Sequence, residues 1–136
     1  MDTEKLFVSV EVLYHSSIRI TGEKTVYVDP FGVDRDYRDA DLILITHDHF
    51  DHFSPDDIAR VRGRDTVIVT PVSIAKKAGE LGFGTVLTAA PGDTLTAAGL
   101  SVRASSMSTE STSSTMAKWC LRCTRYSREI AMLSRR

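Results

Sequence analysis

The sequence of 136 residues predicts an α/β fold in which helices pack on a mixed β-sheet. Three observations carry this prediction. The first third of the chain is rich in short β-type runs, and the middle alternates such runs with helix-type segments. The run 40–46 (ADLILIT) is apolar almost throughout, which is typical of a strand buried on both faces.

The N-terminal region predicts strands joined by short turns. The β-type runs are 6–14 (LFVSVEVLY), 17–20 (SIRI) and 25–29 (TVYVD). Pro30 has no amide hydrogen for a sheet ladder, so we expect the third strand to end at Asp29. A polar connection then leads to the buried strand 40–46.

Beyond residue 52 the pattern becomes helix, strand, helix, strand. Ser54 suits the N-cap of a helix, Pro55 its first position and Asp57 the last place of a capping box. We expect Ile58 and Val61 to face the core. The remaining elements are a strand at 66–70, a helix at 71–82 that ends at Gly82, a strand at 84–90 and a final hairpin through 97–105 (AAGLSVRAS).

Three of the four histidines lie in the heptapeptide 46–52 (THDHFDH), together with two aspartates. The heptapeptide occupies the loop after a buried strand, where α/β proteins build their sites. A single loop histidine is usually just solvated, but imidazole and carboxylate together are ligands that Zn²⁺ and similar metals favour. The candidate ligands are His47, His49, Asp51 and His52. Two pairs of ligands suit two divalent metal ions roughly 3.5–4 Å apart.

The spacing His-x-His-x-Asp-His of residues 47–52 resembles the signature of the metallo-β-lactamase superfamily. The segment 25–32 (TVYVDPFG) is similar to the first motif of that superfamily. The segment 13–20 (LYHSSIRI) is similar to a strand of its lactonase-like branch, which contains ascorbate-6-phosphate lactonase. The resemblance covers about residues 6–104 and implies an αββα sandwich, represented mainly by its N-terminal half.

The resemblance also implies roles for the motif residues. His47 and His49 would bind the first metal, and Asp51 and His52 the second. Asp51 would in addition be the catalytic proton acceptor and donor. Asp29 is expected behind the ligands, where it orients the loop, and His15 either near the pocket or in a structural role.

These roles imply a metal-dependent hydrolase that acts on a small-molecule lactone, ester or phosphodiester. Zinc is the expected metal, with manganese and iron as alternatives, because His/Asp sites accept all three. Metal ions would lower the pKa of a bridging water toward about 7 and so provide hydroxide at neutral pH.

The superfamily needs further ligands later in the chain: a histidine, a bridging aspartate and a final histidine. No histidine follows His52, and no aspartate follows Asp93. We therefore expect a truncated member whose activity is open. The alternative is a non-catalytic metal-binding or interaction fragment, which could associate with itself through an exposed sheet face.

The segment 105–136 differs from the rest. It carries six Lys or Arg and two Asp or Glu, a net charge of +4, whereas residues 1–104 carry −5. It begins within a Ser/Thr-rich run, so we expect a domain boundary at residue 104 and a disordered or out-of-frame tail after it. The basic charge raises the alternative of a nucleic-acid-processing member, but no nucleic-acid motif supports it. The Cys-x-x-Cys of 119–123 (WCLRC) follows a disordered-looking run, whereas a redox motif should follow a strand and open a helix. As a zinc half-site it lacks a second Cys or His pair.

The compartment predicted from the sequence is the cytoplasm. The N-terminus lacks a basic region followed by a long apolar run, which argues against a signal peptide. No stretch approaches the roughly 18 apolar residues of a membrane helix, so no membrane partner is expected. With Cys120 and Cys123 alone, no disulfide framework is expected either.

Overall fold

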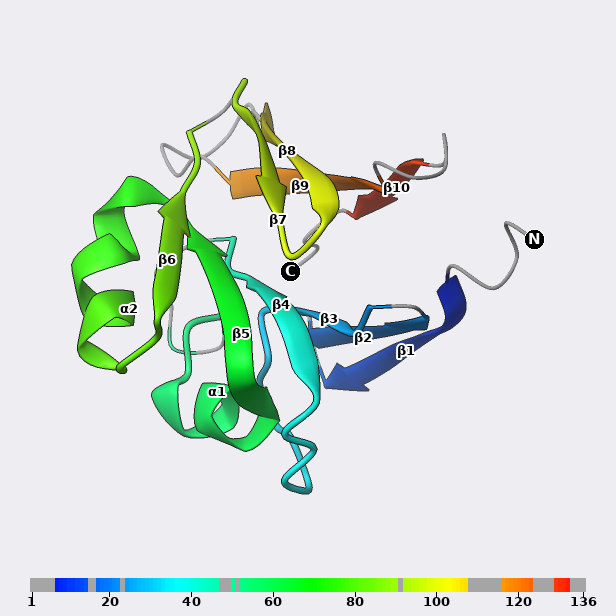
Figure 1. Ribbon diagram of the computed structural model, residues 1–136, viewed down its shortest axis with the longest axis vertical. Helices are drawn as coiled ribbons and strands as arrows, with labels where there is room; N and C mark the ends of the chain where they lie inside the picture. The colour runs from blue at the N-terminus through cyan, green and yellow to red at the C-terminus, as the bar shows by residue number, and fades with distance from the viewer. Residues whose placement is uncertain are drawn as a thin grey trace.

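The computed structural model contains two β-sheets (Figure 1). It describes residues 7–14, 17–22, 24–46, 50, 52–90, 92–107, 116–123 and 129–132. The first sheet contains β1 (Phe7–Tyr14), β2 (Ser17–Gly22), β3 (Val26–Val28), β4 (Ala40–Leu44), β5 (Arg62–Thr70) and β6 (Thr85–Thr88), in that order. The second has the order β10 (Glu129–Met132), β9 (Met116–Cys123), β8 (Leu100–Met107) and β7 (Thr94–Ala97).

The first sheet is mixed, as the sequence predicts. Strands β1, β2 and β3 pair antiparallel, whereas β3, β4, β5 and β6 pair in parallel. Strand β1 therefore runs in the same direction as β3 to β6, and the C-terminal ends of these strands lie at one edge of the sheet. The loops that follow β3 and β4 meet at this edge, which is where α/β sheets form their sites.

Two short helices follow β4 and β5. Helix α1 (Pro55–Val61) begins after Ser54, whose hydroxyl accepts a hydrogen bond from the Asp57 backbone N–H over 3.4 Å and donates one to Asp57 Oδ2 over 2.7 Å. The predicted N-cap is thus confirmed. The helix predicted at 71–82 is a 3-10 turn (Val72–Ile74, η2) followed by α2 (Ala75–Glu80).

The centre of the first sheet around β4 is buried on both faces, which explains the apolar run in β4. Its helix-side cluster includes Ile43 and Ile68 of the sheet, Ile58 and Val61 of α1, and Ile74 and Ala78 from η2 and α2. Its opposite cluster joins Leu42, Leu44 and Val69 to Ala97, Leu100 and Val102 of the second sheet. The layers are therefore helices, first sheet, second sheet (Figure 1). The predicted α/β architecture is confirmed, and Ile58 and Val61 face the core as expected.

The described part of the segment 105–136 differs from the disorder expected there. Strand β8 continues past the expected boundary at residue 104 to Met107, and it pairs antiparallel with β9 from Leu100↔Cys123 to Met107↔Met116. Strand β10 pairs with β9 in turn. The main-chain hydrogen bonds of an edge strand can recruit a further strand without the apolar alternation by which strands are recognised in a sequence.

Strand β9 contains the Cys-x-x-Cys segment. Cys120 and Cys123 both belong to β9, so this segment does not open a helix as a thioredoxin-type motif does. On β7 and on β8 up to residue 104, where burial is described, the exposed residues of the face that points away from the core are polar: Thr94, Thr96 and Arg103. Self-association through an exposed sheet face stays a prediction.

No helix of the described residues has the length and apolar character needed to cross a membrane.

Candidate metal centre

The loop between β4 and α1 contains the candidate ligands. Thr46, Phe50 and His52 of this loop are described, whereas His47, His49 and Asp51 lie outside the described residues, as does His15. The position of the loop at the C-terminal edge of the first sheet is as predicted, because β4 ends at Leu44 and α1 begins at Pro55.

Asp29 lies under this loop and is fully buried. Its Oδ1 accepts a hydrogen bond from the Thr46 backbone N–H over 2.8 Å, and its Oδ2 accepts one from the Thr46 hydroxyl over 2.5 Å. The His52 Nδ1 lies 2.7 Å from the same Oδ2, and His52 is only 3% exposed. One carboxylate therefore connects both ends of the histidine loop.

The backbone of Asp29 explains how it reaches this position. Its amide donates to Leu44 O over 2.9 Å, so the residue still pairs with β4. Its φ of 46° lies in the left-handed region, which aspartate adopts more readily than most residues because its short polar side chain can bond locally. The chain turns sharply where β3 ends, and the Asp29 side chain is directed toward Thr46 and His52.

Burial raises the pKa of the Asp29 carboxyl above its usual range, while the hydrogen bonds from His52 and Thr46 act in the opposite direction and favour the carboxylate. When the Asp29 carboxyl is ionised it can only accept a hydrogen bond, so His52 Nδ1 carries the proton of this contact. The metal-binding nitrogen of His52 would then be Nε2. A carboxylate behind a histidine is the usual arrangement around metal ligands, because it fixes the tautomer and the ring orientation.

The donor chemistry of the loop therefore fits a divalent metal ion. Within the described ranges alone, no group of three His, Cys, Asp or Glu side chains lies together. The fit rests on the Asp29–His52 contact and on the candidate ligands His47, His49 and Asp51, which lie within the five residues before His52 in the sequence. Asp29 contacts both ends of the loop, and its predicted role behind the metal ligands stays a prediction. Thr46 was not predicted, although a polar residue at the end of an apolar strand was a signal that could have indicated it.

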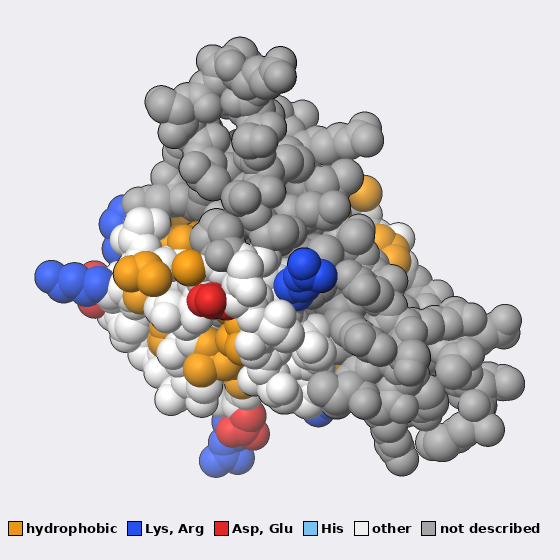
Figure 2. Space-filling model, turned by 90° about the horizontal axis from the view of Figure 1, so that it is seen from above, with side chains coloured by type: hydrophobic (Ala, Val, Ile, Leu, Met, Phe, Trp, Pro, Cys, Tyr) orange, Lys and Arg blue, Asp and Glu red, His pale blue; other side chains and the backbone are white. Residues whose placement is uncertain are grey.

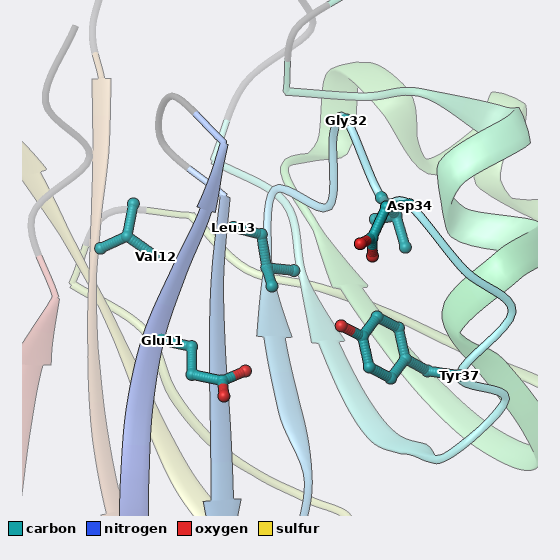
Figure 3. A pocket seen from close by; sticks show the side chains of 7 residues that line it. Glu11, Val12, Leu13, Gly32, Asp34 and Tyr37 are labelled. Carbon is teal, nitrogen blue, oxygen red and sulfur yellow. The ribbon is translucent and has the colours of Figure 1, made fainter.

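A cavity of about 480 Å³ lies on the helix side of β1 (Figure 3). Glu11 and Leu13 point into it from β1, and Asp34 and Tyr37 lie across from them on the loop after β3. This loop is held by Asp39, whose carboxylate accepts hydrogen bonds from Arg19 and from the Tyr27 hydroxyl, each over 2.6 Å. Among the described residues that line the cavity, none is a predicted metal ligand.

Comparison of the sequence with models of protein families assigns the chain to a family. The family model described as the beta-lactamase superfamily domain matches residues 9–118. The chain belongs to this superfamily. The match extends past residue 104 into β9, and it confirms the superfamily resemblance read from the sequence.

Curated relatives in this superfamily are metal-dependent hydrolases. A UPF0173 metal-dependent hydrolase of Pyrococcus horikoshii is 38% identical over 69 residues, which are 44% of this chain and 31% of that protein. One from Thermococcus kodakarensis is 34% identical over 84 residues, which are 54% of this chain and 38% of that protein. The matched part of this chain thus spans about a third of the length of these relatives.

Solved structures of the superfamily fold are also similar. A proposed metal-dependent hydrolase from Parabacteroides distasonis has a TM-score of 0.70 and 28% identity, covering 90% of this chain and 58% of that one. CmlA, a diiron β-hydroxylase from Streptomyces venezuelae, has a TM-score of 0.71 and 21% identity, covering 92% of this chain and 29% of that one. The second likeness concerns the fold alone.

Replacing Asp29 with asparagine should reduce the zinc affinity of the chain by about 10- to 100-fold, the usual cost of losing a partner behind a metal ligand. Asparagine keeps one acceptor oxygen but puts an NH₂ group where His52 or Thr46 now donates. Competition with a chromogenic chelator measures the affinity. Asp34→Asn is the matched control, because it neutralises an exposed carboxylate of the same loop. Equal zinc affinities for the two variants would contradict the supporting role of Asp29.

Proposed function

We propose that this chain carries the metal-binding loop of a hydrolase whose substrate is a small molecule with a lactone, ester or phosphodiester bond. The observation that supports the proposal best is the 2.7 Å contact between His52 Nδ1 and the buried Asp29 carboxylate, inside a loop of ligand-type residues. His47 and His49 would hold one metal ion, and Asp51 and His52 a second. The similarity of residues 13–20 to the lactonase-like branch favours a lactone within this substrate class.

Each residue would have a separate task in the reaction. A bound divalent metal supplies an acidified water and polarises the oxygen of the bond under attack. Asp29 holds the proton on His52 Nδ1 and so keeps the ring oriented toward the metal side of the loop. Asp51 would accept the proton of the attacking water and donate it to the leaving group, since it belongs to the same loop.

Zinc is the metal we propose, with manganese and iron as alternatives. Imidazole suits zinc and iron, and carboxylate also suits manganese. The fold itself does not choose among them, because it is shared with a diiron β-hydroxylase.

A second candidate function is metal binding without catalysis by these 136 residues alone. It is favoured by a specific observation: the sequence contains no histidine after His52 and no aspartate after Asp93. Four ligands for two ions would leave coordination positions to water and would place the nucleophile less accurately. Misplacement of about 1 Å can cost a hundredfold in rate.

A nucleic-acid substrate has less support. On the face seen in Figure 2, the Lys and Arg side chains of the described residues lie apart from one another and among acidic ones. A nucleic-acid interface needs basic side chains gathered in a patch or stripe. The described residues of this face carry no such patch, and we propose a small-molecule partner rather than a nucleic acid.

Titration of the metal-free chain with zinc should give two bound ions and hydrolysis of a simple lactone or of bis(p-nitrophenyl) phosphate. Calorimetry measures the stoichiometry, and absorbance measures the turnover. About one weakly bound ion without turnover would instead support the non-catalytic candidate. A chain that binds no zinc would contradict both.

A further inference from the structure

Three aromatic rings lie in a row that reaches the metal-binding loop. The ring centroids of Tyr14, at the end of β1, and Phe31, after β3, are 5.6 Å apart. Those of Phe31 and Phe50 are 6.0 Å apart, with the rings at 77° in an edge-to-face contact. Both separations are those of favourable ring pairs. Tyr14, Phe31 and Phe50 are called the aromatic row below.

The inner part of the row is held by backbone contacts. Gly32 has a φ of +67°, and a Cβ atom at this position would lie 2.6 Å from Tyr14 Cδ1, so the Tyr14 ring rests directly on the Gly32 backbone. The backbone N–H of Phe31 donates a hydrogen bond to Ser17 Oγ over 3.1 Å, and Ser17 is fully buried. These contacts fix the end of β1 and the loop after β3 relative to each other.

The outer ring is exposed to solvent. Phe50 is 80% exposed and Tyr14 is 50% exposed. Burying a phenyl side chain stabilises a protein by about 1.5–3 kcal/mol, and most of this contribution is forgone at Phe50. Adjoining exposed apolar side chains often mark a binding surface.

The position of Phe50 indicates what the surface would bind. Phe50 stands between His49 and Asp51, and consecutive Cα atoms are about 3.8 Å apart. A group packed on Phe50 is therefore next to any metal held by its neighbours. The row presents on the order of 300 Å² of ring surface, whereas a stable protein interface needs about 800 Å² from each partner. A small molecule fits this area better than a second copy of the chain.

We propose that the aromatic row selects substrates with an apolar ring or similar planar apolar group beside the bond that is hydrolysed. The proposal rests on the proposed function, because the neighbours of Phe50 must hold the metal. The row provides a face for the apolar group, and the metal loop provides the polar contact at its end. Selectivity then arises from the exposed ring of Phe50, with Phe31 and Tyr14 supporting it.

Two hydroxamates with the same metal-binding head group test the proposal without requiring turnover. Phenylacetohydroxamate should bind the zinc-loaded chain about tenfold more tightly than acetohydroxamate, as measured by calorimetry. Phe50→Ala should abolish this preference and leave acetohydroxamate binding intact, whereas Phe50→Leu should keep part of it. Val72→Ala is the matched control, because Val72 is 68% exposed and lies outside the row.

The other outcomes overturn the proposal in distinguishable ways. Equal affinity for both hydroxamates would show that the aromatic row is not a selective surface. The proposed metal site would not be contradicted by this result. Failure of both compounds to bind removes the proposed function and this proposal with it. A native dimer in sedimentation equilibrium that Phe50→Ala converts to a monomer, without any preference between the probes, identifies the row as a contact between copies instead.

Discussion

Replacing His52 with alanine should lower the zinc affinity of the chain by more than about 100-fold, the upper end of what loss of a supporting partner alone usually costs. The variant removes a proposed metal-binding nitrogen and also one of the hydrogen bonds to Asp29. Among the described residues, Thr46 alone would then still donate hydrogen bonds to the fully buried Asp29 carboxyl. We therefore expect a second effect, a loss of about 1–3 kcal/mol in the free energy of unfolding of the metal-free protein.

These two effects can be separated by experiment. Chelator competition gives the zinc affinity, and urea denaturation in the presence of a chelator gives the stability of the metal-free chain. Asp48→Ala is the matched control, because Asp48 belongs to the same heptapeptide but is not one of the candidate ligands. If Asp48→Ala and His52→Ala weaken zinc binding equally, His52 is not a specific ligand and the metal centre must be assigned to other residues.

A double variant that combines Asp29→Asn with His52→Ala tests whether the two residues act on zinc affinity through each other. If Asp29 acts only by orienting His52, then Asp29→Asn should have little further effect on zinc affinity once His52 is alanine. Residues in direct contact commonly show such non-additive effects. Fully additive losses would mean that Asp29 supports the loop through Thr46 rather than through the histidine.

Local chemistry explains which parts of the fold could be predicted from the sequence. Ser54 and Asp57 specify the start of α1 through contacts within three residues, and those contacts are present in the structure. The almost unbroken apolar run of β4 predicts a strand with two covered faces, and both faces are covered. The location of the histidine loop followed from these two elements alone.

Long-range contacts explain what could not be predicted. The contact of Phe31 with Phe50 joins residues from two different loops, and its partner Tyr14 comes from a third segment. Nothing in the spacing of these residues indicates that they meet. The pairing of β9 with β8 is likewise made by main-chain groups, which every sequence carries. The left-handed backbone of Asp29 is a further case, because its φ is set by its place between β3 and the loop above it.

The largest effect on stability is expected at the centre of the first sheet. Ile43 of β4 is fully buried and lies between β3 and β5, opposite Tyr27 and Ile68 in register. Its side chain belongs to the cluster that holds both helices on the sheet. Ile43→Ala should therefore reduce the free energy of unfolding by about 2–5 kcal/mol, the usual cost of a large cavity in a packed core.

The neighbouring residue provides a test of the layer arrangement itself. Leu44 is equally buried but belongs to the cluster that faces the second sheet. If the second sheet covers the first as described, Leu44→Ala should destabilise the chain as much as Ile43→Ala in urea denaturation, whereas the exposed Val72→Ala should have little effect. A small cost at Leu44 together with a large cost at Ile43 would mean that the second sheet does not cover this face in solution. Adjacent positions of one strand thus report on opposite faces, because successive side chains of a strand point to opposite sides of the sheet.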